Sequence, residues 1–164
     1  MPAAPQVRTV PARVLTPIGW VQGSFTVPRL HSFVDHLDHA GPSLRLRGVR
    51  LPGRKDPVKT FVVQRNAVIL VIPDADGQFE RTELVSGRKV DHALSCLLQH
   101  GVVHGRLTTL ASVPVAEFML HHAGFVILRD AVIHLTAGAK PTRPTPAIPR
   151  LLVNAAHVIG VSES

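Results

Sequence analysis

The chain has 164 residues, of which 45% are hydrophobic and 18% are charged, so it can fill a core and is not a disordered tail. Aromatic residues make up only 4%, with no Tyr and one Trp, which predicts an aliphatic core. The formal net charge is +7 and is concentrated in residues 1–72, which hold ten Arg or Lys against three Asp. A region this basic attracts anionic partners, although a high Arg content also serves solubility alone.

The first predicted element is a strand over residues 12–27, interrupted by Gly19 and Gly23. Glycine within a strand indicates a bulge or a bend. A short helix follows, because apolar residues recur at helical spacing and a glycine closes the pattern. These residues are Leu30, Phe33, Val34 and Leu37, with Gly41 after them.

Two further strands complete this half of the chain. Residues 43–51 alternate between apolar residues and arginines, with a slip at Gly48, which predicts one buried face and one basic, solvated face. Residues 60–73 are almost wholly apolar and are expected to be covered on both sides.

The same order of elements recurs further along the chain. Gly19–Gly23 matches Gly101–Gly105, Leu46–Val49 matches Leu128–Ala131, and the run that starts at Phe61 matches the run that starts at Leu151. The second copy is predicted to hold strands over residues 94–109, 125–135 and 151–161. Its helix is expected over residues 113–122, with Ser112 as N-cap, Pro114 in the first turn and Gly124 at the end. Matched blocks in one order indicate an internal repeat.

The predicted fold is therefore mainly β (α+β). It consists of two tandem small β-barrel-like or sandwich-like modules, each with one short helix, related by pseudo-twofold symmetry. Module 1 spans residues 8–73 and module 2 spans residues 93–162. Residues 74–92 connect them, and residues 79–85 are expected to form a hairpin with residues 89–97.

Three segments of each copy resemble a short bacterial domain family of unknown function. That family shows a Ser-Asp-x-Leu-Asn helix, a Phe-x-x-Leu-Thr-Asp-Val strand and a Val-Leu-Val-Asn strand. The matching segments in copy one are Val34–Asp38, Leu44–Val49 and the terminal strand, and those in copy two are Ala116–Met119, Phe125–Ala131 and Leu152–Asn154. The Ser of the helix motif is Val34 in one copy and Ala116 in the other. The resemblance implies a fold and no activity.

The sequence predicts no catalytic residues, no cofactor and no enzymatic activity. Cys96 lies in a predicted strand and is expected to be a buried, inert thiol, while Asp35 and Asp38 are expected on the exposed face of the helix. His36 and His39 are one helical turn apart and are the best metal candidates, but they lack a third ligand, so structural histidines are the preferred interpretation.

Two segments are candidate binding surfaces. A basic patch for nucleic acid or an acidic partner comprises Arg45, Arg47, Arg50, Arg54, Lys55 and Lys59. A partner-binding Pro-rich loop comprises Lys140, Pro141, Arg143, Pro144 and Pro146. The preferred interpretation is a cytoplasmic, non-catalytic protein-interaction or assembly module, either self-associating or an accessory subunit of a larger complex. The first alternative is a nucleic-acid-binding small barrel that uses the basic face of module 1, and the second is an enzyme or a metal-binding protein. No transmembrane segment and no signal peptide are expected.

Overall fold

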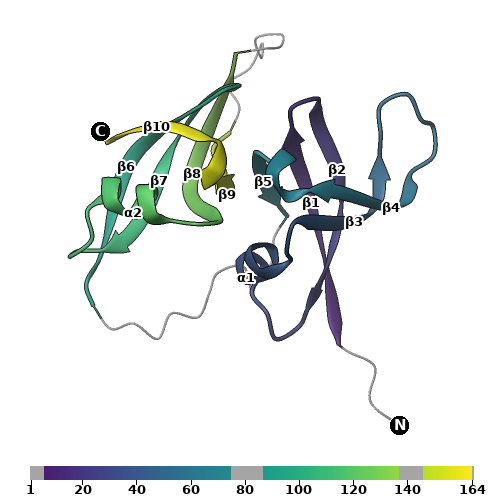
Figure 1. The fold of residues 1–164 in the computed structure, drawn as a ribbon, viewed down its shortest axis with the longest axis horizontal. Coiled ribbons are helices and arrows are strands. Elements are labelled where there is room, and N and C mark those ends of the chain that lie inside the picture. Colours follow the sequence, from purple (N-terminus) through teal and green to yellow (C-terminus); the bar gives the residue numbers. More distant parts are fainter. Residues whose placement is uncertain (1–5, 75–86, 137–145, 164) are drawn as a thin grey trace. The chain divides into compact units, whose positions relative to one another are not determined.

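The computed structural model describes residues 6–74, 87–136 and 146–163, and the side chain of Leu120 lies outside this description. The chain divides into two compact units, Met1–Leu84 and Val85–Ser164. Both are mainly β, as the sequence predicts, and their strands pair antiparallel (Figure 1).

Unit 1 is a five-stranded sheet with the strand order β5-β1-β2-β3-β4. The helix α1 (Phe33–His39) lies between β2 and β3, and the 3-10 turn η1 (Arg65–Ala67) lies between β4 and β5. The strands are β1 (Val7–Thr16), β2 (Gly19–Pro28), β3 (Ser43–Arg50), β4 (Val58–Gln64) and β5 (Leu70–Pro73).

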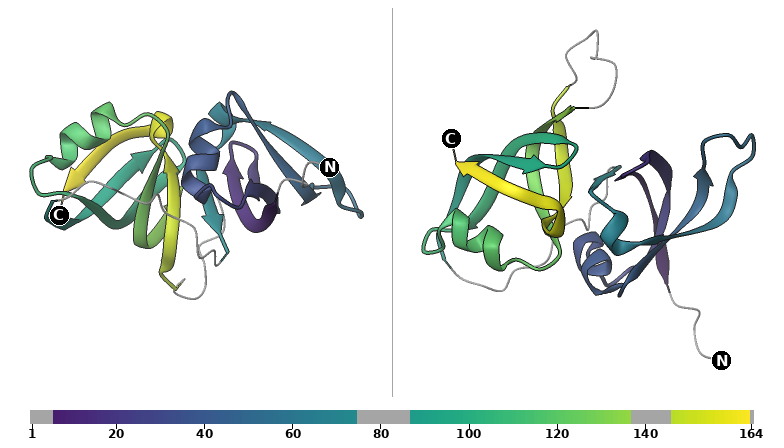
Figure 2. Two further views of the ribbon diagram at one scale, coloured as in Figure 1. Left: turned by 90° about the horizontal axis from the view of Figure 1, so that it is seen from below. Right: turned by 45° about the horizontal axis from the view of Figure 1, so that its top comes forward.

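Unit 2 has the same order of elements, and its strands are arranged β10-β6-β7-β8-β9. The helix α2 (Val115–His121) and the 3-10 turn η2 (Ala155–His157) occupy the corresponding places. The strands are β6 (Lys89–Leu98), β7 (Gly101–Leu110), β8 (Phe125–Leu135), β9 (Ile148–Asn154) and β10 (Val158–Glu163). Both views of Figure 2 show a curved sheet with a short helix beside it in each unit. Within the described residues neither sheet closes on itself, so a barrel or sandwich is not confirmed.

The prediction of one long first strand in each copy is wrong, because each of these segments forms a tight hairpin of two strands. In unit 1 the chain reverses between Thr16 and Gly19, and β1 pairs with β2 along its whole length. In unit 2 the chain reverses between Leu98 and Gly101. Residues 89–92, expected in the connecting segment, belong to β6, and their expected hairpin partner, residues 79–85, lies outside the described residues.

The prediction of one continuous apolar strand at the end of each copy is also wrong. A 3-10 turn breaks it, and the chain then crosses to pair with the first strand of the same unit. In unit 2 the side chain of Asn154 stabilises this turn by accepting a hydrogen bond of 3.1 Å from the backbone N–H of Ala156. The strands are not covered on both sides, since Val62 is 54% exposed and Ile159 is 66% exposed.

The helices are shorter than predicted. Ser32 caps α1 by accepting a hydrogen bond of 3.1 Å from the N–H of Asp35, so Leu30 precedes the helix and is exposed. The end of α1 is as predicted, because Gly41 adopts a φ of +85° directly after the C-cap, Ala40. In α2 the N-cap is Pro114, and Ser112 has no such role.

The core of unit 1 lies between the sheet and α1. Phe25 of β2 meets Phe33 of α1 edge to face, with ring centroids 5.4 Å apart. The other core residues are aliphatic, as the composition predicts, and those of the first three strands are Val10, Ala12, Val14, Val21, Val27, Leu44, Leu46 and Val49. On the opposite side of the sheet Leu15, the partner of Trp20, is also buried, whereas Arg13, Gln22 and the arginines of β3 are exposed.

Candidate functional site

Strand β3 carries the basic face that the sequence predicts. Leu44 and Leu46 are buried, whereas Arg45, Arg47 and Arg50 are exposed. A strand alternates with a period of two, so residues 47 and 50 of a regular strand would point to opposite faces. They share a face here only because one extra residue intervenes.

That extra residue is Gly48, which forms a β-bulge. Its φ of +62° lies in the left-handed region, and the pairing of β2 with β3 shifts register between Gln22 and Ser24. Gly23 of β2 faces the bulge, where a Cβ would lie 2.6 Å from Cγ2 of Val49. Two glycines therefore allow the close approach that brings the arginines of β3 to one face.

The neighbouring strands extend this face. Gln22 pairs with Arg13 of β1 on one side and with Arg50 of β3 on the other, so the three side chains form a row across the sheet. Ser24 and Arg47 lie in the next row. We call Arg13, Arg45, Arg47 and Arg50 the arginine face. All four are exposed.

Trp20 lies at the border of the arginine face. It is the only Trp of the chain and is 38% exposed. Gln22 follows two positions later along β2, so both side chains lie on the same side of the sheet. Because Trp20 pairs with Leu15, it is diagonal to both Arg13 and Arg50. Diagonal neighbours are about 7–8 Å apart, within reach of long and aromatic side chains.

The charges around the arginine face are mostly positive. The strands of unit 1 contain no Asp or Glu. None of the four arginines forms an ion pair with a carboxylate among residues 6–74, 87–136 and 146–163. Arg54 and Lys55 of the β3–β4 loop and Lys59 of β4 are exposed as well, with Asp56 among them. A guanidinium stays charged at any physiological pH, so the positive potential is permanent.

Sequence reasoning identified six of these cations but missed Arg13 and Trp20. Both belong to the β1–β2 hairpin. The sequence predicts a single strand there, and a single strand does not place Arg13 and Trp20 beside β3. Pro17 and Gly19, closely spaced at the point of reversal, are the signal that could have revealed the turn.

The predicted metal candidates do not come together. No cluster of three or more His, Cys, Asp or Glu suited to a metal occurs within the described part of the chain. The His39 ring donates from Nδ1 to the backbone oxygen of Asp35 at 2.8 Å, closing its own helical turn. His36 is half-buried, and burial, with His31 and Arg8 nearby, lowers its pKa. These contacts fit structural histidines.

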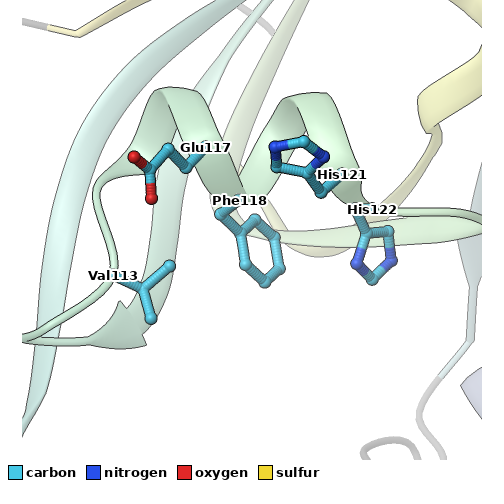
Figure 3. Close-up of a pocket in the computed structure, with 5 residues that line it drawn as sticks. All are labelled: Val113, Glu117, Phe118, His121 and His122. Atoms are coloured by element: carbon cyan, nitrogen blue, oxygen red, sulfur yellow. The ribbon is translucent and has the colours of Figure 1, made fainter.

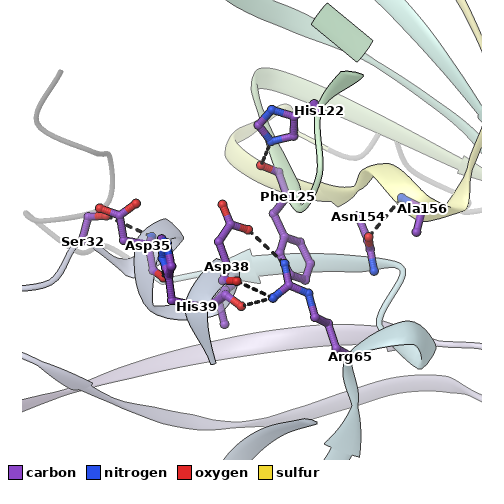
Figure 4. Close-up of polar contacts among 10 residues, drawn as sticks. Ser32, Asp35, Asp38, His39, Arg65, His122, Phe125, Asn154 and Ala156 are labelled. Carbon is purple, nitrogen blue, oxygen red and sulfur yellow. Dashed lines mark hydrogen bonds and ion pairs between the residues drawn. The ribbon is translucent and has the colours of Figure 1, made fainter. Parts of the chain in front are cut away.

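Two other sequence expectations meet different outcomes. Asp38 is not on an exposed face, because its side chain is only 6% exposed and pairs with Arg65 at 3.4 Å (Figure 4). Cys96 is buried as expected, and burial raises the pKa of its thiol to about 11. A thiol with that pKa is protonated at neutral pH and is a poor nucleophile.

Unit 2 has a shallow hollow beside α2, lined by Val113, Glu117, Phe118, His121 and His122 (Figure 3). The rings of Phe118 and His122 stack with centroids 5.0 Å apart. His122 also donates from Nε2 to the carbonyl oxygen of Phe125 at 3.0 Å (Figure 4). The His122 ring therefore supports the chain that enters β8.

Of the predicted Pro-rich loop, Lys140, Pro141, Arg143 and Pro144 lie outside the described residues, and Pro146 is exposed shortly before β9. Comparisons with protein-family models, with curated proteins and with solved structures find no match. The resemblance to a bacterial domain family therefore stays a prediction. Among the described residues, no helix has the length and apolar character needed to cross a membrane.

Proposed function

We propose that this protein is a non-catalytic binding module whose unit 1 holds an anionic partner on the arginine face. The observation that carries the proposal is the set of four exposed arginines on strands that lack any carboxylate. Charges of one sign on one face raise the local concentration of a partner of opposite sign and speed its association.

The rigidity of the face also supports this function. Arg13, Arg47 and Arg50 sit on paired strands directly above the core, so their backbone is fixed before binding. A preorganised surface loses less entropy on association than a loop does. The bulge at Gly48 is consistent with this role, because it is the feature that places Arg47 and Arg50 on the same side.

Salt-dependent retention on immobilised dextran sulfate tests the proposal, since this polymer offers negative charge without bases. The variant Arg47→Gln with Arg50→Gln should bind roughly tenfold more weakly, since each exposed charge pair contributes up to about 1 kcal/mol. The control Arg88→Gln with Arg106→Gln removes the same charge from exposed positions of unit 2 and should bind like the wild type. Equal losses in both variants would reduce the effect to net charge and refute a defined face.

A second candidate function is protein assembly through unit 2. Exposed apolar side chains occur on its two neighbouring strands β6 and β10, with Leu97 48%, Ile159 66% and Val161 37% exposed. Ile159 and Val161 lie on β10, an edge strand, and exposed apolar side chains on an edge strand are typical of protein contacts. Light scattering over a range of concentrations tests self-association. The Ile159→Ser variant should contain more monomer than the wild type at the same concentration. A wild type that is monomeric at every concentration would refute self-association.

We also infer that the two units arose by tandem duplication. Their element orders agree, and the bulge recurs at the equivalent place in the β7–β8 pairing, between His104 and Arg106. Gly48 with φ +62° corresponds to Asp130 with φ +48°, and no other non-glycine residue of the described chain has a positive φ. An unusual backbone conformation shared at one position supports common descent more strongly than strand order does.

A further inference from the structure

We infer that the anionic partner is a single-stranded nucleic acid and that one of its bases stacks on Trp20. This inference rests on the proposed function and specifies its ligand. Three observations support it: the exposure of Trp20, its position between two arginines, and the amide of Gln22 in the same row.

The geometry suits a strand whose backbone and bases are both accessible. Neighbouring strands lie about 4.8 Å apart, so Arg13 and Arg50 stand roughly 10 Å apart with Gln22 between them. Trp20 follows Gln22 on the same side and is diagonal to both arginines. Phosphates held by Arg13 and Arg50 would thus flank a base on the indole ring, while the amide of Gln22 offers a donor and an acceptor to its edge.

A double helix fits this face less well, because its bases are already stacked on one another and expose only their edges. An acidic protein surface would pair with the arginines but offers no planar bases to stack on the indole. Phe25 and Phe33 are buried, and Phe61 pairs with the buried Leu46 on the other side of the sheet. Among the described residues of unit 1, Trp20 is therefore the Phe, Tyr or Trp ring beside the arginine face. Base–aromatic stacking tolerates any sequence, which predicts little base preference.

The emission of the wild-type protein reports on Trp20 alone, because the chain has one Trp and no Tyr. Titration with an oligothymidine of about a dozen nucleotides should quench this emission. In anisotropy measurements with the labelled oligonucleotide, Trp20→Leu should bind about tenfold more weakly, equivalent to about 1.4 kcal/mol. Trp20→Phe keeps a ring and should recover most of the affinity. Leu30→Ser, which alters an exposed apolar residue in the turn after β2, at the opposite end of that strand from Trp20, should bind like the wild type.

Salt provides a second readout. For single strands, log K falls with log[salt] with a slope of about −0.7 per phosphate contact. Arg13→Gln and Arg50→Gln should each make the slope shallower by about 0.7, whereas Trp20→Leu should lower the affinity and leave the slope unchanged. A merely structural role for Trp20 would not separate the two effects in this way.

The outcomes distinguish this inference from the proposed function. If dextran sulfate binds through the arginine face while Trp20→Leu leaves oligonucleotide affinity unchanged, the stacking inference is overturned and the proposed function stands. A duplex of equal length, or a polyglutamate peptide, that binds more tightly than the oligothymidine would also overturn it and identify the partner class instead. If no polyanion binds, both fail. A far-UV circular dichroism spectrum and a melting temperature like those of the wild type show that Trp20→Leu is folded.

Discussion

Replacing Arg65 with Met should destabilise unit 1 by removing the cap at the end of α1. The Arg65 guanidinium donates from Nη1 to the backbone oxygens of Leu37 at 2.9 Å and Asp38 at 2.6 Å. Its Nη2 lies 3.4 Å from Oδ1 of Asp38. Figure 4 shows Arg65 reaching from η1 to the helix. One side chain thus ties the turn after β4 to the last turn of α1.

The magnitude follows from these contacts. Hydrogen bonds from charged donors contribute about 1.5–3 kcal/mol each, but the Arg65 side chain is 20% exposed and the freed carbonyl groups can bind water. We therefore expect Arg65→Met to lower the free energy of unfolding by about 2 kcal/mol. Asp38→Asn removes the charge of the long ion pair and should cost less, about 0.5–1 kcal/mol. The double variant should show a coupling energy no larger than the Asp38→Asn effect.

Urea denaturation followed by Trp fluorescence measures this effect, because Trp20 belongs to unit 1. A loss of 2 kcal/mol should lower the melting temperature of a unit this size by about 8–16 °C. Arg54→Met, at an exposed site of the same unit, is the control and should be neutral. If Asp38→Asn proves as costly as Arg65→Met, the ion pair dominates and the capping argument is wrong.

The remaining predictions concern the backbone, pH and the thiol. Asp130→Gly should stabilise unit 2 by about 0.5–1 kcal/mol and Gly48→Ala should destabilise unit 1 by about 1 kcal/mol in thermal unfolding, because glycine adopts a positive φ without strain. The pKa of His36 is lowered by burial and by nearby His31 and Arg8, so the unfolded state binds more protons and stability should fall as the pH drops below about 6.5. In His36→Gln the loss of melting temperature between pH 7.5 and 5 should be smaller than in the wild type, and an unchanged loss would contradict this reasoning. Cys96, with a pKa raised to about 11, should react with a thiol reagent at pH 8 only as urea unfolds the protein, and prompt reaction without urea would show that it is accessible.

The strands with a clear period of two were predictable. The alternation of β3 gave its bounds within a residue, and β8 (Phe125–Leu135) agrees at both ends. The slip at Gly48 also emerged from the sequence, because the apolar pattern changes phase there and only an extra residue restores it. Local pattern was sufficient for β3 because it has one buried and one exposed face. At the start of β8 the consecutive residues Phe125 and Val126 are both buried, so its bounds followed from the match to the first copy.

The hairpins and the 3-10 turns were not predictable in the same way. Each hairpin reverses over two residues that are not the usual Asn-Gly or Asp-Gly, so periodicity continues through the turn. Each 3-10 turn interrupts a long apolar run without Pro or Gly, and what directs the chain there is a contact distant in sequence. The N–H of Arg65 donates to the carbonyl of Pro42 at 2.9 Å, and that of Ala155 donates to Gly124 at 2.9 Å.

The candidate site shows the same division. The arginines of β3 and the adjoining loop were identified because a single strand displays them. Arg13 and Trp20 were not, since they join the site only through the pairing of β1 with β2. A sheet surface collects residues from several strands, so a sequence indicates its members strand by strand and the pairing register decides which of them meet.

The corresponding face of unit 2 argues that binding belongs to unit 1. Where unit 1 has the row Arg13, Gln22 and Arg50, unit 2 pairs Ser95, His104 and Val132. The two polar side chains of that row are hydrogen-bonded to each other, with the Ser95 hydroxyl 2.6 Å from Nδ1 of His104. Among the described residues no carboxylate pairs with the unit 1 row, so it is open to an external anion, whereas the polar side chains of the unit 2 row bond to each other. We therefore expect the anion to bind unit 1, and the exposed arginines of unit 2 provide a charge-matched control for the dextran sulfate test of the arginine face.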